Sequence, residues 1–200
     1  MKSIALTILL MFFVSSSFAQ ENDYTVYSKI LNRNIGLRNN NGDDLVRVEV
    51  RKRCDCNKEL RELAKSFNEG IAELGYFDES MPSSVDKSEF HKALEMLVKS
   101  RAPKINSDLF QTQIEVNSIS RNGFRRFFRN DDNDGWGRFY KKYEQSAGLY
   151  SFSKVVYSGS LALVYWEMEV SHDYGGGLIS ILLLDGTEFK YVHDVLVWIR

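Results

Sequence analysis

Hydrophobic and polar positions divide the chain into a helical first part and a β-rich last third. Apolar residues that recur every three or four positions predict three helices. The first follows Asp23 and ends at Gly36, the second runs from Asn57 to Gly75, and the third begins at Asp86 and stops before Pro103. The apolar faces are Tyr24, Tyr27, Ile30, Leu31 and Ile35 in the first, Leu60, Leu63, Ala64, Phe67, Ile71 and Leu74 in the second, and Phe90, Leu94, Leu97 and Val98 in the third.

Alternation with a period of two predicts two short strands among these helices, at Leu45–Arg53 and Gln111–Ile119. Four β-rich runs follow at Tyr150–Tyr157, Leu161–Val170, Leu178–Leu184 and Glu188–Ile199. Short turns join these runs, so they must pair antiparallel, because a parallel crossover needs about a dozen residues. The predicted fold is α+β, with N-terminal helices and two short strands followed by a C-terminal antiparallel β-meander of about four strands.

The segment 122–143 is rich in aromatic residues on both sides of an acidic turn. Phe124, Phe127 and Phe128 fit one buried helical stripe, and Trp136 opens a second stripe with helical spacing. Arg121, Arg125, Arg126 and Arg129 are interleaved with the three phenylalanines, which resembles a small nucleic-acid patch. We expect no nucleic-acid partner, because the whole chain shows no basic excess and the arginines then face solvent or the nearby aspartates.

The start of the chain has the pattern of a secretory signal peptide. Lys2 precedes an uncharged run of eleven residues, Ile4–Val14, and small residues stand at Ser17 and Ala19. We expect cleavage after Ala19, a single domain over residues 20–200, and a location beyond the inner membrane, periplasmic or extracellular. The run is shorter than the roughly 20 residues of a membrane-spanning helix. The rest of the chain contains no uncharged run of that length. The residue directly after the cleavage point is Gln20 and not a cysteine, so no lipid anchor is expected.

The cysteines and the acidic turn are candidates for metal chemistry. In an extended segment the spacing of Cys54 and Cys56 disfavours a relaxed disulfide, and no further ligands stand at the spacing of a metal motif. In the acidic turn Asp132 and Asp134 match ligand positions of an EF-hand calcium loop, but Lys141 occupies the place of the bidentate glutamate. We therefore predict a solvated turn, no bound metal and no cofactor.

A glycine-rich segment, His172-Asp173-Tyr174-Gly175-Gly176-Gly177, joins two of the predicted strands. Its backbone N–H groups make it a candidate binding loop, although it lacks the strand-to-helix context of phosphate loops. We predict a wide hairpin loop in which glycine supplies positive φ angles. His172 beside Asp173 also suggests a general base, and the strand before it presents Glu167 and Glu169 on one face.

Five segments of the chain, in order and in similar spacing, resemble a family of uncharacterised exported bacterial proteins. They are Tyr24–Asn32, Trp136–Tyr143 with Gly148 and Ser153 after it, Ala162–Tyr165, Gly175–Gly177 and Val197–Ile199. The resemblance implies secretion and a small α+β fold, and it implies no activity, because none is established for the family. Relatives carry cysteines on both sides of the glycines, where this chain has Ser171–Tyr174 and Leu178.

No assembled catalytic or metal motif accompanies the chain's 26 aromatic residues. The leading hypothesis is therefore a non-enzymatic exported module that binds a protein or a small ligand, with Trp136, Tyr174 and the three glycines as candidate contacts. The alternative is a hydrolase-like enzyme that uses His172 with Asp173 or Glu167.

Overall fold

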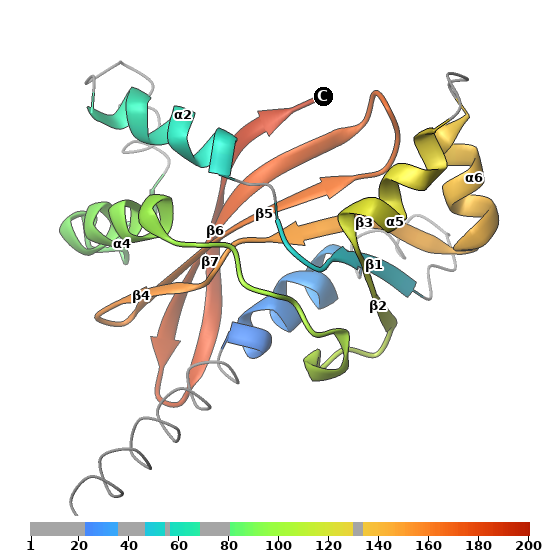
Figure 1. Ribbon diagram of the computed structural model, residues 1–200. Coiled ribbons are helices and arrows are strands. Elements are labelled where there is room, and N and C mark those ends of the chain that lie inside the picture. Colours follow the sequence, from blue (N-terminus) through green and yellow to red (C-terminus); the bar gives the residue numbers. More distant parts are fainter. Residues whose placement is uncertain (1–22, 36–46, 55–56, 69–80, 130–133) are drawn as a thin grey trace, which may run out of the picture.

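The computed structural model describes residues 23–35, 47–54, 57–68, 81–129 and 134–200. Over these residues the chain forms a seven-stranded mixed sheet with helices packed on both faces (Figure 1). The predicted leader, Asp132 and residues 69–75 of the helix predicted to end at Gly75 lie outside the described residues. None of the helices in the described part of the chain is long and apolar enough to span a membrane.

The elements confirm the α+β class predicted from the pattern. After a helix over residues 23–35 come β1 (Arg47–Arg51), α2 (Asn57–Asn68), α4 (Lys87–Lys99), the 3-10 helix η1 (Ser107–Leu109), β2 (Glu115–Ile119), α5 (Arg121–Arg125), the 3-10 helix η2 (Arg126–Phe128), α6 (Gly135–Lys142), β3 (Ser146–Phe152), β4 (Val156–Ser158), β5 (Leu161–Glu169), β6 (Gly175–Asp185) and β7 (Glu188–Ile199). Asp86 caps α4, as expected, by accepting hydrogen bonds from the backbone N–H groups of Ser88 and Glu89. The run predicted as one strand at Tyr150–Tyr157 is divided between β3 and β4.

The strand order is β2-β1-β3-β5-β6-β7, with β4 also paired to β5. Strands β5, β6 and β7 form the predicted antiparallel meander. In contrast, β1 lies between β2 and β3 and runs parallel to both. Long connections that carry α2, α4, α5 and α6 separate these strands along the chain. Strands joined by such long connections can pair in parallel, whereas strands joined by short turns must pair antiparallel.

The two faces of the sheet bury different helices. On one face the helix over residues 23–35, blue in Figure 1, packs on the apolar residues of β1, β3 and β5, and the Tyr27 hydroxyl donates to the Ser153 carbonyl oxygen at 2.8 Å. On the other face α2 and α4 cover Leu161, Leu163 and Tyr165, whereas α5, η2 and α6 form an aromatic cluster over Leu149. Figure 1 shows these two helical groups at opposite sides of the molecule.

Candidate functional site

Polar side chains lie between the two apolar clusters on the face that carries α2 and α6. We call Arg51, Tyr165, Glu167, Glu169 and Trp198 the sheet-face cluster. Strand β5 supplies three of them at alternate positions, so all three point to the same face, as the sequence predicted for the two glutamates. Trp198 reaches this row from β7, because it pairs with Gly177 of β6, which in turn pairs with Glu167.

Glu167 is the buried acid of this cluster, with 9% of its surface exposed. The Tyr165 hydroxyl donates to Glu167 Oε1 at 2.7 Å and accepts from Trp198 Nε1 at 2.8 Å. Burial raises the pKa of Glu167 to about 7, and the negative charges of Glu59 and Glu169 act in the same direction. The hydrogen bond from Tyr165 opposes this rise in pKa without cancelling it. Glu167 therefore binds a proton over most of the range below neutral pH.

The second carboxyl oxygen of Glu167, Oε2, differs from Oε1 in its contacts. Within the described part of the chain Oε2 takes part in no hydrogen bond or ion pair, and it is not among the buried unpartnered polar atoms. It therefore keeps contact with solvent. A carboxylate oxygen in this position accepts hydrogen bonds and attracts cations.

Glu169 lies in a different electrostatic setting two residues further along β5. Its Oε1 forms an ion pair with the Arg51 guanidinium at 2.7 Å, and both side chains are half-buried. The same guanidinium lies 4.9 Å from the centre of the Phe124 ring of α5. Arg51 therefore joins β1, β5 and the aromatic cluster, while its buried Nε has no hydrogen-bond partner in the described residues.

The three glycines have a different role from the one predicted. Gly175–Gly177 are the first residues of β6 and not part of a hairpin loop, and the described glycines with positive φ are Gly148, Gly159 and Gly186. At Gly177 an added Cβ would lie 2.2 Å from Trp198 Nε1 and 2.6 Å from Tyr165 Oη. Glycine is thus needed here for the close approach of Trp198 and Tyr165 and not for an unusual backbone angle.

The other candidate residues are dispersed around this cluster. His172, Asp173 and Tyr174 are exposed in the connection between β5 and β6, and no hydrogen bond or ion pair among the described residues joins His172 to Glu167. Trp136 packs in the aromatic cluster against Phe124 and Phe139. The hydroxyl of Tyr140, one turn after Trp136, donates to the Val170 carbonyl oxygen at 2.8 Å, so α6 contacts the end of β5.

Neither Arg51 nor Trp198 was predicted as a member of the sheet-face cluster, because each reaches the cluster from a distant strand.

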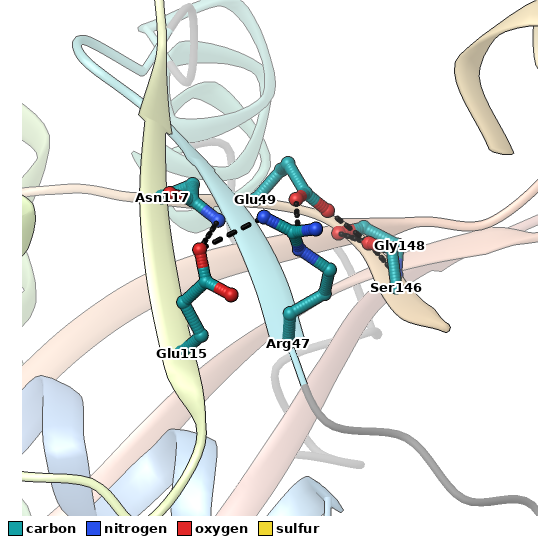
Figure 2. Close-up of polar contacts among 6 residues, drawn as sticks. All are labelled: Arg47, Glu49, Glu115, Asn117, Ser146 and Gly148. Carbon is teal, nitrogen blue, oxygen red and sulfur yellow. Dashed lines mark hydrogen bonds and ion pairs between the residues drawn. The ribbon is translucent and has the colours of Figure 1, made fainter. Parts of the chain in front are cut away.

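A second polar cluster ties β1 to both of its neighbours (Figure 2). Glu49 is fully buried and accepts a hydrogen bond from the Ser146 hydroxyl, while its Oε1 lies 3.4 Å from Arg47 Nε. Arg47 also pairs with Glu115 at 2.8 Å, and Glu115 accepts from the Asn117 amide at 2.9 Å. Burial raises the pKa of Glu49, whereas Ser146 and Arg47 oppose the rise. These contacts hold three strands together.

The candidates for metal chemistry have separate outcomes. Asp134 is exposed just before α6, and the described residues contain no group of three acidic, histidine or cysteine side chains placed to hold a metal ion. Cys54 is buried and disulfide-bonded, a redox state that the sequence left open, and Cys56 lies outside the described residues. In the structure β1 ends at Arg51, before Cys54.

Comparison with known proteins gives no match: no family model, no curated protein and no solved structure is similar to this chain. The sheet-face cluster combines a buried acid, an ion pair and two aromatic side chains. A strongly raised pKa that arises from burial and specific charged neighbours is typical of functional sites. The sheet-face cluster is therefore the feature from which we infer function.

Proposed function

We propose that this protein is an exported, non-enzymatic binding module whose sheet-face cluster binds a ligand or protein segment that carries an amine or guanidinium cation. The observation that carries the proposal is the Glu167 carboxyl, which is buried and bonded to Tyr165 while its Oε2 meets solvent. A buried carboxyl costs free energy to ionise, and the positive charge of Arg51, which lowers the pKa of Glu167, is shared with its ion-pair partner Glu169. A cationic ligand at Oε2 offsets that cost.

The charges around Glu167 favour a cation. Glu59 and Glu169 add negative charge near Glu167, and Arg51 is already paired with Glu169. A bound cation favours ionised Glu167 and lowers its pKa, so ligand binding and proton release are coupled. This face already accepts a guanidinium, because that of Arg200 lies 5.3 Å from the centre of the Trp198 ring.

Export rests on the leader pattern and on the family resemblance, both of which come from the sequence. Lys2, the uncharged run Ile4–Val14 and Ser17-Phe18-Ala19 support secretion into the periplasm or beyond. N-terminal sequencing of protein recovered from the periplasm and from the medium tests this part. A start at Gln20 supports export with cleavage, and an intact Met1 in a cytoplasmic fraction contradicts it.

The binding part is tested by calorimetric titration with methylguanidinium and with arginine-containing peptides, using methylurea as the neutral probe of the same shape. We expect the cations alone to bind, with affinity rising as the pH passes through about 7, where Glu167 ionises. Glu167→Gln should weaken binding at least about tenfold, because it removes the charge that pairs with the ligand. The control is Glu95→Gln, which removes an exposed acid of α4. Equal binding of methylurea, or unchanged affinity in Glu167→Gln, contradicts the proposal.

A second candidate, a hydrolase-like enzyme that uses His172 with Asp173 or Glu167, has one observation in its favour. The carboxyl of Glu167 holds a proton near neutral pH, while Glu169 on the same strand face is ion-paired, which is the arrangement of an acid beside a base. His172→Ala separates the two candidates in assays with chromogenic esters and glycosides. If the protein is such an enzyme, His172→Ala loses nearly all turnover. If it is the binding module, neither form turns over these substrates and His172→Ala keeps its affinity for methylguanidinium.

A further inference from the structure

Exposed cations gather on the outer surface of α5, η2 and α6. The segment 121–142 holds seven basic and three acidic residues, an excess of four positive charges in a chain whose formal charge is −1. Arg121 is one of the exposed members, and we call the other five the basic surface: Arg125, Arg126, Arg129, Lys141 and Lys142. Positive charge is therefore concentrated at one side of a molecule that is close to neutral overall, the side opposite α4 in Figure 1.

Contacts between α6 and η2 join these cations into one surface. Arg138 Nε donates to the Phe127 carbonyl oxygen at 2.8 Å, and Lys142 Nζ lies 5.9 Å from the centre of the Phe127 ring. Beneath the cations the aromatic cluster packs edge to face, with Phe127 and Phe139 rings 5.7 Å apart. The cations thus stand on a packed aromatic base and not on independent loops.

The cations of the basic surface differ from three arginines elsewhere in the fold in how their charges are balanced. Arg33, Arg47 and Arg51 each form an ion pair with an acidic side chain. In the described part of the chain Arg125, Arg126, Arg129 and Lys141 form none. Four positive charges close together and without acidic partners repel one another, and an anionic partner relieves that repulsion.

Phe128 adds an apolar contact at the same place. It is the last residue of η2, and 39% of its surface is exposed. Its ring packs 5.9 Å from that of Trp136 and over Gly135, where a Cβ would lie 2.1 Å from the ring. An aromatic side chain held outward among cations is the combination that favours the boundary between lipid headgroups and acyl chains.

We propose that the basic surface docks the protein onto anionic phospholipid bilayers, with the cations on the headgroups and Phe128 at the boundary with the acyl chains. Peripheral binding of this kind depends on charge and needs no membrane-spanning segment. The exposed aromatic ring favours a bilayer over a soluble polyanion, since a polyanion rewards the cations alone. The proposal stands on a different surface from the sheet-face cluster, so either can fail without the other.

The test is vesicle co-sedimentation with protein purified after expression with its own leader. We compare phosphatidylcholine vesicles with vesicles that contain about one third phosphatidylglycerol. We expect binding to the anionic vesicles alone, and we expect it to weaken as salt is raised. Binding driven by an uncleaved hydrophobic leader would instead be equal on both kinds of vesicle and insensitive to salt, and that result overturns the proposal.

Variants assign the binding to the surface. Neutralising three cations in Arg125→Gln/Arg126→Gln/Arg129→Gln should lower vesicle affinity on the order of a hundredfold, since each cation near an anionic bilayer contributes about fivefold. The matched control, Lys92→Gln/Arg101→Gln/Lys104→Gln, removes the same charge from exposed positions on and after α4 and should bind as the unchanged protein does. Equal losses in the two triple variants show that net charge alone matters and overturn the proposal.

Two further measurements complete the test. Phe128→Ser should weaken binding to anionic vesicles while leaving binding to heparin unchanged, because only a bilayer contacts the ring. Thermal melting confirms that each variant is folded. Tight binding to heparin or to DNA together with no binding to anionic vesicles contradicts a lipid partner.

Discussion

The hydroxyl of Tyr165 donates to Glu167 at 2.7 Å, and these two residues lie on the same face of β5 with one residue between them. The same hydroxyl accepts from Trp198 of β7, so the acid is held in place by a strand two positions away in the sheet. Burial of this arrangement keeps a proton on Glu167 up to near-neutral pH. The predictions on Glu167 and its neighbours follow from this relationship.

Replacing Tyr165 by Phe should destabilise the fold by about 1–3 kcal/mol, because it leaves Glu167 without its donor and Trp198 Nε1 without its acceptor. It should also raise the pKa of Glu167 further, since the hydrogen bond from Tyr165 lowers that pKa. Chemical denaturation measures the stability, and NMR titration of the carboxyl measures the pKa. Tyr174→Phe, on an exposed ring, is the control and should change neither. A fully stable Tyr165→Phe variant would show that the network contributes nothing.

Stability should depend on pH through Glu167. Its pKa is raised from 4.5 to about 7, so the folded chain binds a proton that the unfolded chain has lost between these values. The stabilisation is complete below about pH 4.5 and is lost as the pH rises to about 7, on the order of 3 kcal/mol in total.

Glu167→Gln should flatten this pH dependence, as measured by the free energy of unfolding from pH 4 to 8. A smaller slope of the same sign should remain at the acidic end, because burial also raises the pKa of Asp23 to about 6. Glu95→Gln on the surface of α4 is the control and should keep the full slope. An unchanged slope in Glu167→Gln would place the responsible group elsewhere.

Gly177→Ala should destabilise the protein by about 1–3 kcal/mol, because the new methyl group overlaps Trp198 and Tyr165. The neighbouring Gly176→Ala is a close control, since its Cβ would meet only the Trp198 carbonyl oxygen at 3.4 Å. Both variants add the same methyl group to β6, and only Gly177→Ala should shift the tryptophan fluorescence. Equal melting temperatures for the two variants would argue against a close-packing role for Gly177.

Arg47→Leu should cost about 3–5 kcal/mol, because it leaves the fully buried Glu49 without a cation. The double variant Arg47→Leu/Glu49→Leu should cost less than the single one, since no buried charge then remains. Lys190→Leu, which removes an exposed cation paired with Asp185, is the control and should leave stability almost unchanged, because solvent screens an exposed ion pair. A double variant less stable than Arg47→Leu would mean that the two side chains do not act as a charged pair.

Much of the fold could be predicted because its signals are local. The alternation in β5 correctly placed Glu167 and Glu169 on one face. The start of α4 at Asp86 depends on a few adjacent residues. The glycine triplet was misplaced in a loop, because sequence shows that glycine is required without showing whether the cause is a backbone angle or a neighbouring side chain.

Local spacing was enough for the α+β class, the face of each strand and the order of the final meander, because helix and strand periodicity act over a few residues. The pairing of Arg51 with Glu169 could not be read in this way, since the two residues are 118 positions apart and meet only because β1 inserts beside β3. The same holds for Trp198 against Gly177 and for the protonated state of Glu167, which depends on how deeply the fold buries it. Contacts between distant segments and the burial that shifts a pKa are properties of the packed sheet, and no local pattern encodes them.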